Sequence, residues 1–445
     1  MNKPPAKKPV YTTNAYAFTH PYSIGAVAAL SGHQPPPVVR SVVEWGCGTG
    51  WNLIALAARL PEASFVGVDL DGTAIGVGRE RIKKLGLKNI ELLTARFEHS
   101  ETAPADYQIV HGLYSWIGKR SQEHLLARLL YGAKPDGLIF LSYNTLPGWA
   151  LGDVLRPVIR NGPLDAMTLI TLLAHSRTIQ PTPDQAALTA KFAAVAAAVE
   201  KQPDYLDHEW LEPQAAGSWH KDVISVAKAY KLIYCGDTDL TVWGTNGLTP
   251  EAAMVIEQFK ADPAIFGTLR DILTMETFRR SVFCYEPKAA SEGVPALCVF
   301  HSLTRQDGFW QHADGRTLTV PPGSQLDALL TAMTAFPGGQ YVTVLADQAS
   351  LPLDVACAVL PLLALKGLVT FRSAPLFTPP DVERPVCDPF VRQCIENNFP
   401  LVSKAHVQAE LHPTVVDFLS KLDGQRVSGE DQALVATLGR TGFLI

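Results

Sequence analysis

Glu44-Trp-Gly-Cys-Gly-Thr-Gly50 is the stretch that decides the fold of this chain. It follows the apolar pair Val42-Val43 and precedes a segment, 52–59, whose apolar residues have helical spacing. A second apolar run then ends in Asp69, 19 residues beyond Gly50. A strand, a glycine-rich turn, a helix, a strand and an acid in this order are typical of a nucleotide-cofactor site in an α/β domain.

The details of the turn favour S-adenosylmethionine (SAM) over a dinucleotide. The spacing is Gly46-x-Gly48-x-Gly50, whereas dinucleotide sites use G-x-G-x-x-G. Glu44 would lie badly beside a pyrophosphate, but it suits a ligand with an ammonium group and a sulfonium. Asp69 stands where an acid accepts hydrogen bonds from ribose hydroxyls. The alternative is that the glycines serve only the packing of the helix on the sheet.

We expect the cofactor to contact the turn, the end of the second strand, and the segments after the third and fourth strands. The candidate cofactor-binding residues are Glu44, Gly46, Cys47, Gly48, Gly50, Asn52, Asp69, Leu70, Arg96, Phe97 and His111. Cys47 is interpreted as a small turn residue rather than a redox group.

Composition sets the broad class of the protein. The chain has 445 residues, which suggests two to four domains, and its 47% hydrophobic and 18% charged residues indicate folded domains. A net charge of −5 gives no electrostatic footprint for nucleic acid. The basic, proline-rich start lacks the apolar segment of a signal peptide, and the longest apolar run, 355–365, is too short to span a bilayer. Seven scattered cysteines without a C-x-x-C pair fit a reducing, cytoplasmic location and predict no metal site.

Strands and helices alternate through the first third of the chain. Strands are predicted at 41–45, 64–69, 90–93, 107–111 and 137–143, with helices between them. This alternation predicts a Rossmann-like α/β fold with a parallel sheet and helices on both faces. Ligands bind at the carboxyl ends of such strands, so the loops that follow the strands are the candidate site.

Four parts of the chain are predicted. The segment 186–199 is alanine-rich and suits a helix packed on a partner, which makes a homodimer our expectation. Two closing strands of the sheet are expected at 231–235 and 240–243, and 250–283 is expected to be mostly helical. The parts are an N-terminal arm or lid at 1–40, a SAM-binding domain at 41–245 with a helical insertion at 151–217, a middle regulatory, mostly helical domain at 246–375, and a winged-helix-like C-terminal domain at 376–445.

Two aromatic, polar loops follow the fourth and fifth strands. The first is His111-Gly-Leu-Tyr-Ser-Trp116 and the second begins Ser142-Tyr-Asn144. His111 is a candidate proton acceptor, whereas Tyr114 and Tyr143 are candidates to hold an amine. Asn144 is a candidate acceptor of an amine N–H bond. The alternative is that His111 is a satisfied strand-end residue and that Trp116 and Trp149 pack in the core.

The segment Tyr205-Leu-Asp-His-Glu-Trp210 is a third polar and aromatic cluster. It lacks the second histidine of a zinc motif, because position 212 is Glu212. We expect it to lie over the substrate cleft.

With these motifs the chain resembles the bacterial class I SAM-dependent methyltransferases that carry a methyltransferase regulatory domain. The rickettsial protein-lysine methyltransferases that act on outer-membrane protein are similar to it. The resemblance extends over nearly the whole chain. It rests on Thr19-His-Pro21, Glu44 to Gly50, Gly67-Val-Asp69, the two loops at 111–116 and 142–149, Tyr205 to Glu209, Phe278-Arg-Arg280 and Leu422-Asp-Gly424.

The resemblance implies a Rossmann-like catalytic domain, a helical dimerisation region, a middle domain and a winged-helix-like C-terminal domain. It also implies SAM contacts from Glu44, Gly46, Gly48, Asp69 and the backbone at Phe97. One position departs from the family pattern: Arg96 stands where an Asp often precedes the adenine contact.

Three functions are compatible with the sequence. The first is N-methylation of lysine side chains in a protein substrate, which the extra domains favour. The second is a small-molecule N- or O-methyltransferase of secondary metabolism. The third is a SAM-binding regulatory or scaffold protein.

Overall fold

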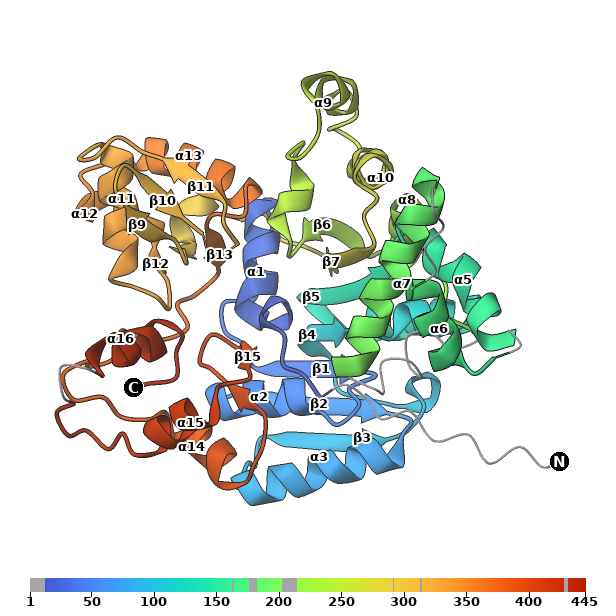
Figure 1. Cartoon of the computed structure of the whole chain (residues 1–445), viewed down its shortest axis with the longest axis horizontal. Coiled ribbons are helices and arrows are strands. Elements are labelled where there is room, and N and C mark those ends of the chain that lie inside the picture. Colours follow the sequence, from blue (N-terminus) through green and yellow to red (C-terminus); the bar gives the residue numbers. More distant parts are fainter. Residues whose placement is uncertain are drawn as a thin grey trace.

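A seven-stranded sheet is the centre of the computed structural model, which describes residues 13–161, 164–175, 182–201, 214–290, 292–312, 314–427 and 431–445 (Figure 1). The strand order is β3-β2-β1-β4-β5-β7-β6. Neighbouring strands pair in parallel from β3 to β5, whereas β7 is antiparallel to both β5 and β6. The strands are β1 Ser41–Trp45, β2 Ser64–Asp69, β3 Ile90–Thr94, β4 Ala105–Val110, β5 Ala133–Asn144, β6 Ile233–Asp237 and β7 Phe278–Cys284.

Both faces of the sheet are buried, which explains why its strands read as nearly continuous apolar runs. On one face, α1 (Pro21–Leu30) and α2 (Trp51–Arg59) pack on alternate strand residues such as Val42 and Phe140. On the other face, α4 (Lys119–Tyr131) and α8 (His220–Ala229) cover the intervening residues, among them Val43. The helix α3 (Gly72–Leu85) runs beside β2 and β3.

The five strands predicted from the alternation are confirmed, and so is the strand expected near 231–235. The prediction of a strand at 240–243 is wrong, because Leu240–Trp243 is a short 3-10 helix, η5. Asp239 caps this helix by accepting a hydrogen bond from the Thr241 amide, and the Trp243 indole donates to the Asp237 carbonyl at 2.9 Å. These local bonds turn the chain out of the sheet, and a short apolar run alone does not distinguish the two structures.

The last strand of this sheet in sequence is β7, which lies between β5 and β6. It begins in the stretch 250–283 that we expect to be mostly helical. That stretch forms α9 (Pro250–Glu257) and α10 (Pro263–Thr274) before the strand begins. The sheet therefore includes 278–284, residues that the predicted division places in the middle domain.

Residues 21–30 of the predicted N-terminal arm form α1, a core helix in which Ile24 is fully buried. Within the predicted insertion 151–217 lie the helices α5 (Ala150–Asn161), α6 (Ala166–His175) and α7 (Pro183–Lys201), and α6 packs against α7 (Figure 1). The predicted cluster 205–210 lies outside the described residues.

The middle part of the chain has its own apolar core around Trp310, Leu329 and Leu360. It contains two small sheets, ordered β12-β8-β13 and β11-β10-β9. Its elements are β8 Cys298–Phe300, β9 Thr304–Gln306, β10 Phe309–Gln311, β11 Thr317–Thr319, α11 Gln325–Thr334, β12 Gln340–Tyr341, α12 Val342–Gln348, α13 Leu353–Leu365 and β13 Thr370–Arg372.

The C-terminal part packs directly on α2, beside the seven-stranded sheet. Its apolar core includes Trp51 of α2, whose ring lies 6.1 Å from that of Phe390 and 5.8 Å from that of Phe399. Near the end of the chain, Cys387 and Leu444 form an isolated antiparallel bridge. The described elements are α14 Pro389–Glu396, β14 Leu401–Val402, β15 Gln408–Ala409, α15 Pro413–Ser420 and α16 Gln432–Arg440.

The described residues contain no single helix that is long and apolar enough to cross a membrane. By length and composition alone, the pair α12 and α13 passes the same test together, although the two helices are bent by 114°.

A buried ion cluster joins β6, β7 and α10. The Arg279 guanidinium contacts Asp237 at 2.8 Å and Asp271 at 2.6 Å, and all three side chains are at most 1% exposed. Replacing the arginine alone would leave two carboxylates buried without a cation.

We expect Arg279→Leu to lower the free energy of unfolding by about 3–5 kcal/mol, the usual cost of breaking a buried ion pair from one side. The matched control is Lys260→Ala, which removes a half-exposed ion pair with Glu257 and should cost at most about 1 kcal/mol. Urea denaturation followed by circular dichroism measures both, and equal losses for the two variants would contradict the expectation.

Candidate active site

The glycine turn between β1 and α2 has the backbone geometry that its sequence demands. Gly46, Gly48 and Gly50 have φ angles of +74°, +55° and +71°, which side chains with a Cβ rarely adopt. The Gly46 amide donates to the Val68 carbonyl at 2.8 Å, so the turn is tied to the neighbouring strand β2. Gly50 immediately precedes the first turn of α2.

Two further glycines let the surrounding elements approach the turn. A Cβ on Gly78 of α3 would lie 2.2 Å from the Thr49 carbonyl oxygen, and one on Gly67 of β2 would lie 2.6 Å from Leu92. The Cys47 side chain faces Gly67, and burial raises its pKa well above the usual value. Cys47 therefore remains a protonated thiol, which agrees with its interpretation as a small turn residue.

Two cavities meet at the carboxyl ends of the strands. The smaller, of about 160 Å³, is lined by the turn, by the N-terminal residues Asn14 and Tyr16, and by His111, Asn144 and Phe278. The larger, of about 370 Å³, is lined on its other side by residues that follow β2 and β3. Both share Gly46, Gly112 and Trp116. Together they form an elongated cleft along the edge where the sequence predicts the cofactor.

The larger cavity has the groups that a nucleoside needs. Asp69 is 4% exposed and accepts hydrogen bonds at 2.8 Å from the amides of Gly48 and Asp71, one on each carboxylate oxygen. Each oxygen keeps a second lone pair for a ribose hydroxyl. Leu70 and Phe97 line the same cavity, and Leu70 is 61% exposed, so its apolar surface is free to cover a flat base.

Arg96 also lines the larger cavity, but its guanidinium pairs with Glu98 at 3.2 Å. Glu98 is a lining residue that sequence reasoning missed. It receives hydrogen bonds from Arg96 and from the Ser121 hydroxyl, and together with its own backbone amide these groups hold the pKa of its carboxyl below the usual range. It is the acid closest in sequence to the position where the family pattern has an Asp.

Glu44 is the buried acid of the smaller cavity. It is 4% exposed, and the Asn52 amide donates to both of its carboxylate oxygens at 3.3 Å. Burial raises the pKa of Glu44 to about 8; the hydrogen bond from Asn52 lowers it and the charge of Asp69 raises it further. Within the described parts of the chain no Lys or Arg forms an ion pair with Glu44. The cavity therefore offers an uncompensated acid, which fits the ammonium group of SAM.

His111 lies in the smaller cavity as a neutral imidazole. Its Nδ1 is 2.9 Å from the Ser142 hydroxyl, and the rings of Tyr16 and Phe18 stand edge-on to it at 4.2 and 5.2 Å. Burial, together with the charge of Arg280, lowers the pKa of His111 to about 4. A base of this pKa holds a proton poorly near pH 7. The low pKa therefore does not favour His111 as the predicted proton acceptor.

Asn144 is the polar group best placed for an acceptor substrate. Its side chain is 5% exposed and lines the smaller cavity, and its amide nitrogen has no hydrogen-bond partner among the residues that the structure describes. The backbone is fixed on both sides, since its N–H donates to the Ser115 hydroxyl and its carbonyl accepts from the Ser218 amide. A rigidly held and unsatisfied amide in a cavity is ready for a ligand.

The structure does not bring Tyr143 and Tyr114 into the cleft, although the sequence predicts both as amine-binding residues. Tyr143 is 1% exposed, and its hydroxyl lies 2.6 Å from His220 Nδ1 and 3.1 Å from the Ser281 hydroxyl. Tyr114 packs against it with ring centroids 6.1 Å apart. Neither lines the two cavities; both belong to the core on the α8 side of the sheet. Alternation along β5 explains this, since residue 143 points away from the face that residue 144 presents.

Sequence reasoning also missed some lining residues of the smaller cavity. Tyr16 lies in the N-terminal arm, and the hydrogen bond from its amide to the Asn52 side chain joins segments that no local pattern connects. Phe278 lies at the start of β7 and also lines this cavity. Trp116, for which core packing was the alternative, lines both cavities, and the Arg156 guanidinium lies 5.6 Å from its ring and 4.8 Å from that of Trp149.

Fold and cleft together define a class I methyltransferase domain. Residues 42–137 match the family model of the methyltransferase domain, and residues 202–285 match the model of a predicted methyltransferase regulatory domain. The chain thus combines a methyltransferase domain with a methyltransferase regulatory domain, which confirms the class that the sequence motifs predict.

Similar proteins come from Rickettsia. The protein RP789 of Rickettsia prowazekii is 30% identical over 296 residues, which cover 62% of this chain and 51% of that protein. RP028 of the same organism is 34% identical over 152 residues, covering 34% of this chain and 61% of that protein. The matched region thus spans about half to three fifths of the length of these relatives.

The solved structure of PKMT2 from Rickettsia typhi has the same fold over nearly the whole chain. It superposes with a TM-score of 0.82 at 20% identity and covers 98% of this chain and 99% of that one. Its complex with AdoHcy gives a TM-score of 0.80 over 96% and 91% of the two chains.

We expect Asp69→Asn to weaken SAM binding by about 10- to 100-fold, because the charge-assisted hydrogen bonds of a buried carboxylate are lost. The matched control is Asp71→Asn, two residues away, where the side chain caps α3 and does not line the cleft. Isothermal titration calorimetry measures both dissociation constants. Unchanged affinity in Asp69→Asn would overturn the placement of the cofactor.

Binding of SAM at pH 7 is expected to release about one proton. The carboxyl of Glu44 has a pKa of about 8 in the free protein, and a ligand ammonium beside it favours the ionised form. Affinity should therefore rise as the pH increases from 6 towards 8. Calorimetry in two buffers of different ionisation enthalpy counts the protons.

The control for this experiment is Glu44→Gln, which should bind SAM more weakly and release almost no proton at pH 7. The ligand's own α-amino group begins to lose its proton near pH 8, but it does so with either protein. Equal proton release by the parent and the variant would mean that Glu44 is not the titrating group.

Proposed function

We propose that the protein is a SAM-dependent methyltransferase that N-methylates lysine side chains of a protein substrate. The observation that carries the proposal is a single cavity in which the buried side chains of Glu44 and Asn144 lie among the rings of Tyr16, Trp116 and Phe278. When bound, SAM supplies an electrophilic methyl group on a sulfonium, and in-line transfer needs only an aligned, deprotonated nucleophile.

Different residues of the cleft would bind different parts of SAM and of the acceptor. Asp69 would hold the ribose and Glu44 the ammonium group of SAM, while Leu70 and Phe97 would cover the adenine. Asn144 would accept an N–H bond from the acceptor amine through its amide oxygen. The faces of Tyr16, Trp116 and Phe278 would attract a cationic group by cation–π contact and exclude water.

The proton balance favours an amine over a hydroxyl acceptor. A lysine ammonium loses its proton to solvent before attack, and a dry aromatic pocket lowers its pKa. A hydroxyl acceptor needs a base at the site, and His111, with a pKa near 4, is a poor one near neutral pH. O-methylation is therefore the less favoured form of the small-molecule alternative.

The accessory parts of the chain favour a protein over a small molecule. The C-terminal part contacts both the glycine-turn helix and the N-terminal segment: the Gln408 side chain accepts from the Ala15 amide at 3.1 Å and donates to the Thr13 carbonyl. A small acceptor does not require so large a surface beside the cleft. The resemblance to rickettsial protein-lysine methyltransferases points the same way.

The proposal also covers the location, partners and assembly of the protein. It would act in the cytoplasm, without nucleic acid as a partner, and would form a homodimer through its helical insertion. We also retain a winged-helix-like C-terminal domain as part of the proposal, with helices α15 and α16 as its described helices. The two alternatives remain a small-molecule methyltransferase and a SAM-binding regulatory or scaffold protein.

The test uses methyl-labelled SAM and a cell lysate fractionated by size. We expect label on a protein band that yields methyl-lysine after hydrolysis, and none with the Asp69→Asn variant. Asn144→Ala should slow transfer by about 10- to 100-fold, the cost of a positioning hydrogen bond of 1–3 kcal/mol, while the SAM dissociation constant changes by less than about threefold.

Each other outcome selects an alternative. Label confined to the small-molecule fraction would reject a protein substrate. SAM binding without transfer to any fraction would leave the regulatory or scaffold function. An equal loss of binding and transfer in Asn144→Ala would place this residue in the cofactor site instead.

A further inference from the structure

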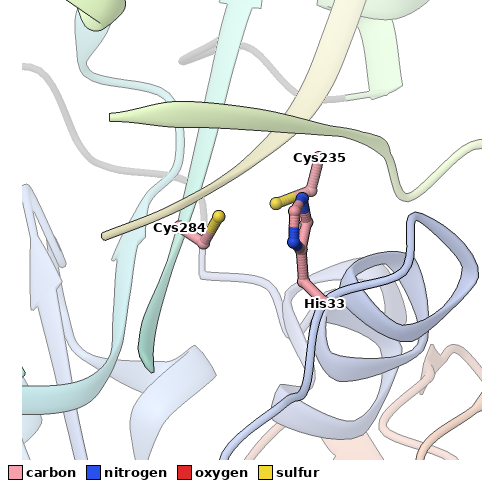
Figure 2. A group of neighbouring side chains, drawn as sticks. All are labelled: His33, Cys235 and Cys284. Atoms are coloured by element: carbon pink, nitrogen blue, oxygen red, sulfur yellow. The ribbon is translucent and has the colours of Figure 1, made fainter. Parts of the chain in front are cut away.

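Three side chains from distant parts of the sequence meet at the far end of the β6–β7 pair. His33, Cys235 and Cys284 each present one nitrogen or sulfur atom, and these three atoms lie within 4.8 Å of one another. In Figure 2 the side chain of His33 extends from the segment after α1 towards the sulfur atoms of Cys235 and Cys284. The cysteines are 5% and 1% exposed, whereas His33 is partly exposed.

The fold brings the two thiols to the same face of the sheet. The pairing of β6 with β7 is regular at Ile233 and Cys284 and then shifts between Tyr234 and Gly236, so that Cys235 lies in a bulge. A bulge re-aims a side chain and bends its strand. Both thiols therefore point to the α1 side of the sheet, where each donates weakly to the same carbonyl oxygen, that of Ile233, at 3.6 Å.

The backbone fixes His33 opposite the thiols. It follows the end of α1, its amide donates to the Ala28 carbonyl at 2.9 Å, and it forms an antiparallel bridge with Ala289, just beyond β7. Its imidazole makes no hydrogen bond to any residue that the structure describes. The position of the ring is thus set by the main chain, while its nitrogen atoms remain open to a ligand.

We propose that His33, Cys235 and Cys284 form a binding site for a thiophilic transition metal ion, with Zn²⁺ as its natural occupant. Two thiolates and one imidazole are the donor set that Zn²⁺ accepts, with a fourth tetrahedral position for a non-protein ligand. The charges balance, because two thiolates and a neutral imidazole around Zn²⁺ have zero net charge. A neutral centre suits a buried position, where an uncompensated charge is costly.

Formation of the site conserves mass and charge in a simple way. Two S–H bonds break, two metal–sulfur bonds and one metal–nitrogen bond form, and two protons leave to the buffer. The cysteines are reduced before and after the step, so no oxidant is needed.

The metal would lie away from the proposed methyl transfer and would not depend on it. Cys284 ends β7, whereas Phe278 at the start of that strand lines the cofactor cleft. Six residues of strand separate the two by about 20 Å. The ion would instead fasten the end of α1 to β6 and β7, which also meet there through the hydrogen bond from the Ser31 hydroxyl to the Cys235 carbonyl and the bridge between His33 and Ala289.

The experiment uses the full-length protein, stripped of metal with a chelator under reducing conditions and titrated with Co²⁺. We expect one equivalent to bind with an intense near-ultraviolet band from thiolate-to-metal charge transfer, which Zn²⁺ then removes. Binding of Zn²⁺ should release about two protons and raise the midpoint of thermal unfolding, because the ion binds only the folded chain. The SAM dissociation constant should change by less than twofold.

Variants separate this site from a general effect of buried thiols. Cys284→Ser should abolish the charge-transfer band, and His33→Ala should weaken Co²⁺ binding at least tenfold. The matched control is Cys298→Ser, which removes a fully buried thiol outside the cluster and should retain the full band. His33 is partly exposed, so its variant keeps the test valid if Cys284→Ser fails to fold.

Three results would overturn the proposal. One is less than a tenth of an equivalent of Co²⁺ or Zn²⁺ bound at micromolar concentrations. Another is an unchanged band in both Cys284→Ser and His33→Ala. The third is recovery of Cys235 and Cys284 as a disulfide from protein handled with a reductant present, which would assign the pair to redox chemistry instead.

Discussion

The side-chain amide of Asn52 is the contact on which the cofactor end of the structure depends. Its nitrogen donates to both oxygens of Glu44, while its oxygen accepts from the Tyr16 amide at 3.2 Å and the Thr19 hydroxyl at 3.0 Å, and lies 2.9 Å from Nε2 of His406. One residue in the first turn of α2 thereby joins the glycine-turn acid, the N-terminal segment and the C-terminal part of the chain. Glu44 therefore cannot shift without disturbing the N-terminal segment and the C-terminal part.

This arrangement gives the accessory parts a direct physical route to the cleft. His406 is 1% exposed and has a positive φ of 58°, so its backbone adopts an uncommon conformation in the loop between β14 and β15 to reach Asn52. Burial and the charge of Arg372 lower the pKa of His406 to about 3, so the imidazole is neutral and its Nε2–H donates to the amide. Docking of the C-terminal part and orientation of Glu44 are therefore parts of one hydrogen-bonded unit.

How far the sequence could predict this molecule depends on the range of the interactions involved. The glycine turn, Asp69 and the first five strands follow from local patterns, and the structure has them where they are expected. The closing strand β7 did not follow, because an antiparallel strand inserted between β5 and β6 is specified by its partners rather than by its own residues. The same holds for Asn52 and His406, which are 354 residues apart. The sequence also did not show which of two adjacent residues in β5 faces the cleft. Asn144 faces the cleft and Tyr143 faces the core, and the alternation of side chains cannot be assigned when a segment is read as a loop.

Parity along β7 shows how a single strand serves two sides of the sheet. Phe278 lines the cleft and Arg280 stacks over Phe18 on the α1 side, whereas Arg279 points to α10 and holds two buried carboxylates. An arginine on each side of a core strand would destabilise the fold unless each cation pairs with an anion or stays near water. Arg279 finds Asp237 and Asp271, and Arg280 finds Asp239 at the sheet edge. The strand that the local pattern leaves unspecified is thus fixed by charge pairing with Asp237 of β6, Asp239 before η5 and Asp271 of α10. This pairing brings Phe278 to the smaller cavity of the cleft.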